Sequence, residues 1–194
     1  MADTALTRTV DGLEVPTPGT FELDPAHSHV GFSVRHMMVS RVRGRFASFS
    51  GVVTVADDPA ASSVEVTIDV ASIDTRDETR DNHLRSPDFF DAEKYPTITY
   101  RSRGVTVTGP GRFTVQGDLT VRDVTRPVDL DVTYEGVAKD PWGNQRFGIT
   151  ATTEIDREDF GLTWNQPLET GGVLVGKSAR IEIEAEAVRK TEEG

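Results

Sequence analysis

Apolar and polar residues alternate along most of this chain, in runs separated by Gly, Pro and Asp. A period of two is typical of strands that bury one face. In the run 179–187, small and aliphatic residues alternate with Arg180, Glu182, Glu184 and Glu186. Comparable runs lie at 30–38, 46–55, 64–70, 97–108, 115–121, 128–134 and 147–155. The pattern predicts an antiparallel, all-β meander of about eight strands.

A single sheet of that size exposes two long edges unless it closes or splits. We therefore expect a closed barrel with a tapered interior, with a two-sheet sandwich as the alternative. The inward positions include several small residues, namely Gly117, Ala151, Ala179, Ala185 and Ala187. Small inward residues favour a hollow that holds a ligand over a barrel filled with side chains.

Residues 75–95 break the alternation and carry the signals of short helices. Thr75 followed by Glu78 matches a capping box. Ser86, with a proline and an acidic residue after it, matches a second helix start. Only a few apolar residues are available to anchor these turns. The segment is therefore predicted to be a helical excursion that lies over one barrel opening.

The expected organisation is one domain at 19–190 with short tails. Residues 1–18 are polar and end in Pro-Thr-Pro-Gly, which predicts a flexible N-terminal tail. Residues 191–194 are predicted to be a C-terminal tail. We find no apolar stretch long enough for a signal peptide or a transmembrane segment, so we expect a cytoplasmic protein.

Composition narrows the functional classes. The chain has 194 residues, with 21 Lys and Arg against 32 Asp and Glu, a formal net charge of −11. This balance argues against nucleic-acid binding and against broad adhesion to anionic lipid surfaces, while a local basic pocket stays open. The chain has no cysteine, which removes thiol chemistry and cysteine metal sites.

The stretch GGVLVGKS at 171–178 matches the phosphate-binding loop pattern letter for letter. That loop needs a strand before the glycines and a helix after the Lys-Ser pair. Here the following residues alternate with a period of two, which predicts a strand. We therefore expect a glycine turn that leads into the last strand, and no bound nucleotide.

Histidines and arginines supply the other candidate chemistry. His27 and His29 are spaced like a metal pair, but catalytic zinc needs three ligands, and parity places His36 on the opposite face. We predict no metal and no cofactor. His36 lies on the apolar face, where it is either a hydrogen-bonded core residue or a polar contact inside a cavity.

Two further polar groups stand out in the sequence. Arg35, Arg41, Arg43 and Arg45 are either a solvated strand face or a phosphate clamp at a pocket mouth. The sequence 80–83 contains an arginine, an aspartate and a histidine, for which an exposed helix face is favoured over acid–base chemistry. No nucleophile motif accompanies them.

Four separated stretches, in this order, resemble the YceI-like, polyisoprenoid-binding family. They are DPAHSHVGFSVRHMMVSRVRGRF, IDTRDETRDNHLRSPDFFDAEKYPTITY, GDLTVRDVTRPVDLDV and REDFGLTWNQPLETGGVLVGKSARIEIEAEA, and the resemblance covers about 20–189. It implies a lipocalin-like antiparallel barrel that holds a long apolar chain, typically an isoprenoid, sometimes with a phosphate or quinone-like head. It implies no catalytic activity, and it suggests a homodimer. Asp123 and Lys177 depart from the family pattern.

The predicted function is non-enzymatic binding, transport or sequestration of a long isoprenoid-type lipid inside the barrel. Two alternatives stay open: an enzyme that acts on such a substrate through His36 or His83, and a metal protein built on His27 and His29. The expected ligand-binding residues are Phe32, Val34, His36, Arg41, Arg43, Phe46, Phe49, Arg80, His83, Phe89, Phe90, Tyr100, Leu119, Phe147, Trp164 and Ile181.

Overall fold

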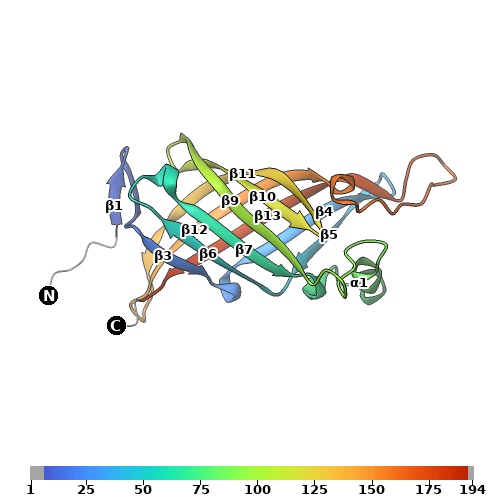
Figure 1. The fold of residues 1–194 in the computed structure, drawn as a ribbon, viewed down its shortest axis with the longest axis horizontal. Helices are drawn as coiled ribbons and strands as arrows, with labels where there is room; N and C mark the ends of the chain where they lie inside the picture. Colours follow the sequence, from blue (N-terminus) through green and yellow to red (C-terminus); the bar gives the residue numbers. More distant parts are fainter. Residues whose placement is uncertain (1–6, 192–194) are drawn as a thin grey trace.

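The computed structural model describes residues 7–191, and strands dominate it (Figure 1). The strands are β1 Thr7–Val10, β2 Leu13–Pro16, β3 Gly19–Leu23, β4 His29–His36, β5 Ser40–Phe46, β6 Phe49–Val55, β7 Ser63–Asp69, β8 Ile73–Asp74, β9 Thr97–Gly109, β10 Arg112–Val121, β11 Val124–Lys139, β12 Gln145–Asp156 and β13 Val175–Arg189. One α-helix, α1, spans Glu78–Arg85, and short 3₁₀ turns lie at Pro25–His27, Pro59–Ala61, Val70–Ser72 and Arg157–Phe160.

Antiparallel pairing closes these strands into a barrel. The order β12-β11-β10-β9-β7-β6-β3-β13 returns to its start, because β13 also pairs with β12. This confirms the predicted closed barrel of about eight strands and rules out the sandwich alternative. Because the barrel closes, none of these eight strands is an edge strand. A sheet of this size would otherwise expose two long edges.

Two positions in the barrel wall are each built from two strands. β4 continues the line of β3 along β13, and β5 continues the line of β6. The breaks lie at 24–28 and 47–48. Beyond them, β4 and β5 form a hairpin whose outer edge, among residues 7–191, pairs only with the two-residue β8. The alternation did not predict β3, which has only five residues, or β5, whose alternating arginines were interpreted as either a solvated strand face or a phosphate clamp.

The N-terminal segment forms a hairpin, so the predicted flexible tail is wrong for residues 7–16. β1 and β2 pair through the two-residue turn Asp11-Gly12, whose φ values of 50° and 82° fit a type I′ turn. Arg8 donates hydrogen bonds to the carbonyls of Ala56 and Asp57 at 2.5 and 2.7 Å, which fixes the hairpin to the barrel. The predicted tails at 1–6 and 192–194 lie outside the described residues.

The predicted helical excursion is present, but its caps differ from the prediction. Asp77, not Thr75, caps α1 by accepting a hydrogen bond from the Arg80 amide at 3.0 Å. Buried Thr75 instead donates its hydroxyl proton to Asp81 at 2.6 Å. Ser86 ends α1 and starts no second helix. The segment lies at one end of the barrel, opposite β1 (Figure 1).

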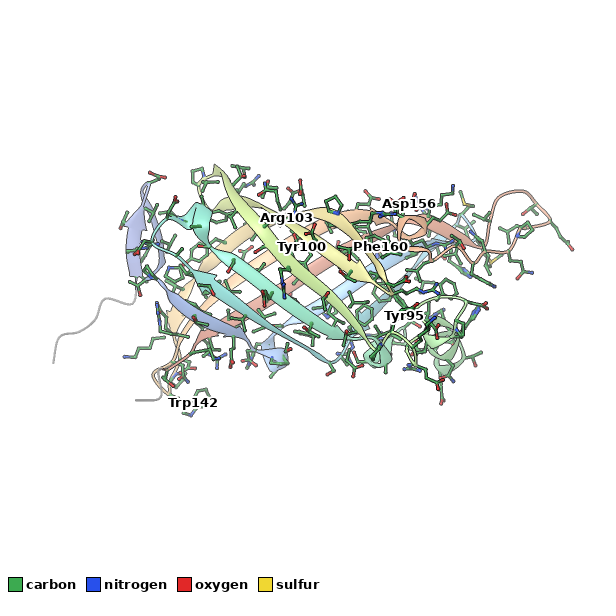
Figure 2. All side chains as sticks on the ribbon, in the orientation of Figure 1. Tyr95, Tyr100, Arg103, Trp142, Asp156 and Phe160 are labelled. Atoms are coloured by element: carbon green, nitrogen blue, oxygen red, sulfur yellow. The ribbon has the colours of Figure 1, made fainter. Side chains whose placement is uncertain are left out.

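Part of the barrel interior is packed rather than hollow. The ring of Tyr100 occupies the space over Gly117, and its hydroxyl donates to the Val128 carbonyl at 2.8 Å. Phe21 and Phe147 pack edge to face, with ring centroids 4.8 Å apart, near the hairpin. Figure 2 shows Tyr100 on its strand near the middle of the barrel. The small residue at 117 therefore accommodates an aromatic ring, not a ligand.

Gly117→Ala is expected to destabilise the barrel by about 1–3 kcal/mol, because an added Cβ must displace tightly packed atoms. That Cβ would lie 2.4 Å from Tyr100 Cζ and 2.8 Å from the Arg101 carbonyl oxygen. The control is Gly104→Ala, whose added Cβ would meet only Gln116 Oε1 at 3.4 Å. Urea denaturation measures both, and equal free energies of unfolding would contradict the packing argument.

Candidate functional site

A cavity of about 950 Å³ lies inside the barrel. Its wall is formed by the inward side chains of the strands, and on β12 these are Phe147, Ile149, Ala151, Thr153 and Ile155. At about 3.3 Å per residue this run covers roughly 26 Å along the strand, or about 20 Å along an axis to which strands tilt by about 40°. The cavity is therefore long and mostly apolar, and its shape suits an extended hydrocarbon chain.

The β1–β2 hairpin covers one end of the cavity. Val10, Leu13 and Val15 from the hairpin contribute to its lining. Tyr134 also lines the cavity, and its buried hydroxyl has no hydrogen-bond partner among the described residues. Burial, with a contribution from Glu14, raises the pKa of Tyr134 to about 12, so this phenol stays neutral. It is an unused hydrogen-bonding group beside an apolar space.

Polar side chains gather at the other end, beneath α1. His36, Arg80 and His83 all line the cavity there. His83 contacts Asp88 at 2.9 Å, and its ring packs edge to face on Trp164 with centroids 4.6 Å apart. Arg80 donates to the hydroxyl of Thr75 at 2.7 Å and to its carbonyl at 2.8 Å. This end can offer hydrogen-bond donors and positive charge to a ligand.

Arg157 holds the loop that forms the rim at this end. Its guanidinium donates to the carbonyls of Leu162, Trp164, Val175 and Gly176 at distances between 2.5 and 3.3 Å. The residue is 5% exposed, and no carboxylate of the described chain forms an ion pair with it. Burial lowers the pKa of Arg157. The side chain ties Trp164, and through it the cavity rim, to β13.

The cavity brings together most of the residues predicted to bind a ligand. Those that line it are Phe32, Val34, His36, Phe46, Arg80, His83, Phe89, Phe90, Tyr100, Leu119, Phe147, Trp164 and Ile181. Ligand contact by these residues remains a prediction. Three others are placed elsewhere. Phe49 is buried in the packed core outside the cavity lining, and Arg41 and Arg43 are exposed on the outer face of β5, because Val42 takes the inward position between them.

The glycine stretch at 171–178 is a turn followed by β13, as the alternation predicted. A strand after the Lys-Ser pair provides no helix N-terminus to receive phosphate. Lys177 forms an ion pair with Glu158 at 3.2 Å, and its side chain is two-thirds exposed. It does not line the cavity and is therefore not placed to meet a ligand inside the barrel.

His27 and His29 do not converge on a common site. His29 is exposed, and His27 contacts Asp24 at 2.8 Å. Asp24, His27 and Glu186 lie close enough together to suggest a metal site. The Arg146 guanidinium, however, binds Asp24 at 2.6 Å and Glu186 at 3.4 Å, and hydrogen bonds from Arg146 and His27 lower the pKa of Asp24. This fixed positive charge disfavours a cation there.

Sequence reasoning missed three parts of the site: Arg157, Tyr134 and the β1–β2 hairpin. Arg157 lies in a stretch of charged residues and gives no sign of being buried. Tyr134 ends the alternating run 128–134, which gives no sign that its hydroxyl lies beside a cavity. The hairpin did carry a signal, because an Asp-Gly pair flanked by alternating residues is a strong indication of a two-residue turn.

Arg157→Met is expected to lower the free energy of unfolding by about 3–5 kcal/mol, because it removes charge-assisted hydrogen bonds and leaves buried carbonyls without a donor. The control is Arg180→Met, since Arg180 is half exposed and pairs with Glu182 on the surface. Chemical denaturation followed by circular dichroism compares them. Similar losses in the two variants would show that Arg157 does not hold the rim.

Comparison with known proteins places this fold in a family. Residues 21–187 match the model of the YceI-like domain. The UPF0312 protein SA2479 of Staphylococcus aureus is 40% identical over 168 residues, which cover 86% of this chain and 95% of that protein. None of the helices in residues 7–191 is long and apolar enough to cross a bilayer.

Solved structures agree with this match. The Campylobacter jejuni YCEI protein is 34% identical with a TM-score of 0.69, over 87% of this chain and 97% of that one. BcnA of Burkholderia cenocepacia is 25% identical with a TM-score of 0.75, and the match covers 84% of this chain and 98% of BcnA. A polyisoprenoid-binding domain from Saccharophagus degradans, 15% identical with a TM-score of 0.66 over 90% and 100%, shares the fold. The chain belongs to the YceI-like family.

Proposed function

We propose that this protein binds a long isoprenoid-type lipid inside its barrel and carries or sequesters it without chemical change. The observation that carries the proposal is the elongated cavity of about 950 Å³ with an apolar wall along the strands and polar groups at its ends. A volume of this size lies at the upper end of the range for small-molecule sites. The Saccharophagus degradans domain, which is named for polyisoprenoid binding, shares the fold. The proposal of lipid binding by this protein rests on the cavity of this protein.

The free energy of burial favours a long hydrocarbon ligand over a compact one. Burial of apolar chain contributes about 0.8 kcal/mol per CH₂ group, so each five-carbon unit adds a few kcal/mol. Association costs on the order of 4–15 kcal/mol before net binding begins. Several units in contact with the wall are therefore enough for tight binding, with no need for a strong head-group contact.

The head group is proposed to lie at the α1 end. His36, Arg80 and His83 supply donors there, whereas the hairpin end offers mainly aliphatic side chains. Arg8, Asp11 and Tyr134 also line the hairpin end, but the Arg8 guanidinium already donates to backbone carbonyls. Arg41 and Arg43 have no part in this contact, since they lie on the outer face of the barrel. The wall provides affinity in this arrangement, and the three polar residues set the orientation of the chain.

Mass spectrometry of organic extracts of the purified protein tests the proposal directly. We expect a co-purifying apolar ligand of the prenyl class, because a wall of this kind binds such chains from cell lipids. A matched pair on β13 tests the location. Ile181→Trp fills the cavity and is expected to weaken binding of a fluorescent prenyl probe by about tenfold or more, as steric overlap replaces wall contact. Glu182→Trp, which faces outward, is expected to bind normally.

Absence of any extractable apolar ligand, together with no binding of prenyl probes in vitro, would exclude lipid binding. Equal affinities of the Ile181→Trp and Glu182→Trp variants, with native circular dichroism spectra, would place the ligand outside the barrel.

Arg80→Gln tests the orientation of the ligand. The variant is expected to weaken binding of farnesyl phosphate by about tenfold while leaving farnesol unchanged, since a charge-assisted hydrogen bond is worth about 1.5–3 kcal/mol. Arg76→Gln is the control, because Arg76 is exposed and does not line the cavity. Calorimetric titration with both ligands gives the ratio of affinities. An unchanged ratio in Arg80→Gln would remove Arg80 from the head-group site.

A further inference from the structure

The tip of the β4–β5 hairpin exposes three consecutive apolar side chains. Met37 is 44% exposed, Met38 58% and Val39 79%. The tip lies at the same end of the barrel as α1, just past the last residue pair between β4 and β13, and the loop before β13 extends further at this end (Figure 1). His36, at the base of this tip, lines the cavity. The exposed apolar tip therefore lies next to the polar end of the cavity.

The turn at this tip has residues that its backbone disfavours. Met37 and Met38 have φ values of 51° and 63°, and the amide of Val39 donates to the His36 carbonyl at 3.1 Å. Two central residues with positive φ define a type I′ turn, for which Asn-Gly is the preferred pair. Unbranched but bulky apolar residues in this conformation are uncommon. The Met38 side chain lies near Gly172 of the rim loop, yet both methionines remain exposed.

Exposed arginines surround the same hairpin, and one of them, Arg35, also borders the cavity. Arg35, Arg41 and Arg43 are exposed, and within residues 7–191 no carboxylate forms an ion pair with any of them. Arg35 and Arg41 lie directly opposite each other in the register of β4 and β5. Like charges in that position are unfavourable. In a chain with a net charge of −11, this is a local positive patch that lacks a counter-charge.

We propose that the β4–β5 tip docks on an anionic lipid bilayer, with its apolar side chains inserted and its arginines at the head groups. Arg41 follows Val39 by two residues, or roughly 7 Å along the strand, which matches the depth of about 5–10 Å that interfacial segments reach. The acidic remainder of the protein limits contact to this tip. This interaction goes beyond cargo binding and does not depend on it.

Docking in this way would face the polar end of the cavity toward the membrane. The Met37 amide donates to the Leu174 carbonyl at 2.9 Å, so the tip is tied to the loop that forms the cavity rim. Leu174 itself lines the cavity. Contact between tip and bilayer therefore brings the rim, and with it the proposed entrance for a lipid, close to the surface from which such a lipid would come.

Vesicle flotation with the full chain tests the proposal, using vesicles that contain no prenyl lipid. We expect the protein to float with vesicles of phosphatidylcholine mixed with phosphatidylglycerol, and to be released as salt screens the arginines. It is expected not to float with phosphatidylcholine alone. Equal binding to both vesicles, or binding to neither, would overturn the proposal while leaving cargo binding inside the barrel unaffected.

Two sets of variants separate the apolar from the electrostatic contribution. Met37→Asn with Met38→Gly installs the preferred turn pair, so the fold is kept or stabilised while membrane binding falls by about tenfold or more. Arg41→Gln with Arg43→Gln is expected to weaken binding by about thirtyfold, at roughly fivefold per arginine near the surface. Arg112→Gln with Arg126→Gln makes the same change in charge at exposed arginines elsewhere and is expected to bind normally. Unchanged binding in both tip variants would overturn the assignment.

A fluorophore reports the orientation. Because the chain has no cysteine, Val39→Cys carries a single environment-sensitive label. Its emission is expected to shift to the blue on anionic vesicles. The control is Trp142→Cys, since Trp142 is 81% exposed at the end of the barrel that carries β1 and β2 (Figure 2). A shift at position 142 with none at position 39 would reverse the proposed orientation and overturn the assignment to the β4–β5 tip.

Discussion

Pairing of β13 along both of its edges is the interaction on which the rest of this structure depends. It joins β12 on one side to β3 and β4 on the other, and so turns a sheet with two open edges into a wall around a cavity. Most backbone groups of the eight-stranded ladder then find their partners within the barrel, and the inward side chains can be apolar. The space that they enclose follows from closure.

The two ends of the cavity are closed by different means, and this gives the barrel a direction. At one end Arg8 and Arg189 fasten the N-terminal segment by hydrogen bonds to backbone carbonyls, and the β1–β2 hairpin adds aliphatic side chains. This hairpin precedes the segment that matches the family model. At the other end Arg157 holds a loop whose Trp164 packs on His83. Arginines bonded to carbonyls thus fasten both ends, and of these Arg157 is buried while Arg8 and Arg189 are half-buried. The histidines that face the cavity, His36 and His83, both lie at the α1 end.

The β4–β5 hairpin contains two features that local backbone and charge preferences disfavour. Its turn puts methionines where small polar residues are favoured, and its strands oppose Arg35 to Arg41. Sequences that specify one fold are usually consistent at every level, so local conflicts of this kind point to function. The strands behind the hairpin, by contrast, follow the alternation closely, because they serve only to build the wall.

Alternation by itself determined the all-β class and the identity of most inward residues, since a period of two assigns each side chain to one face. It favoured a closed barrel, but the pairing of β13 with β12 was needed to exclude a two-sheet sandwich. It also showed that GGVLVGKS leads into a strand. Tertiary structure decided what the inward residues do. Gly117 accommodates the ring of Tyr100, Phe49 is packed in the core, and Arg157 is buried because two carbonyls of the following loop and two of β13 meet it. Such contacts join residues far apart in the chain, and no local pattern encodes them.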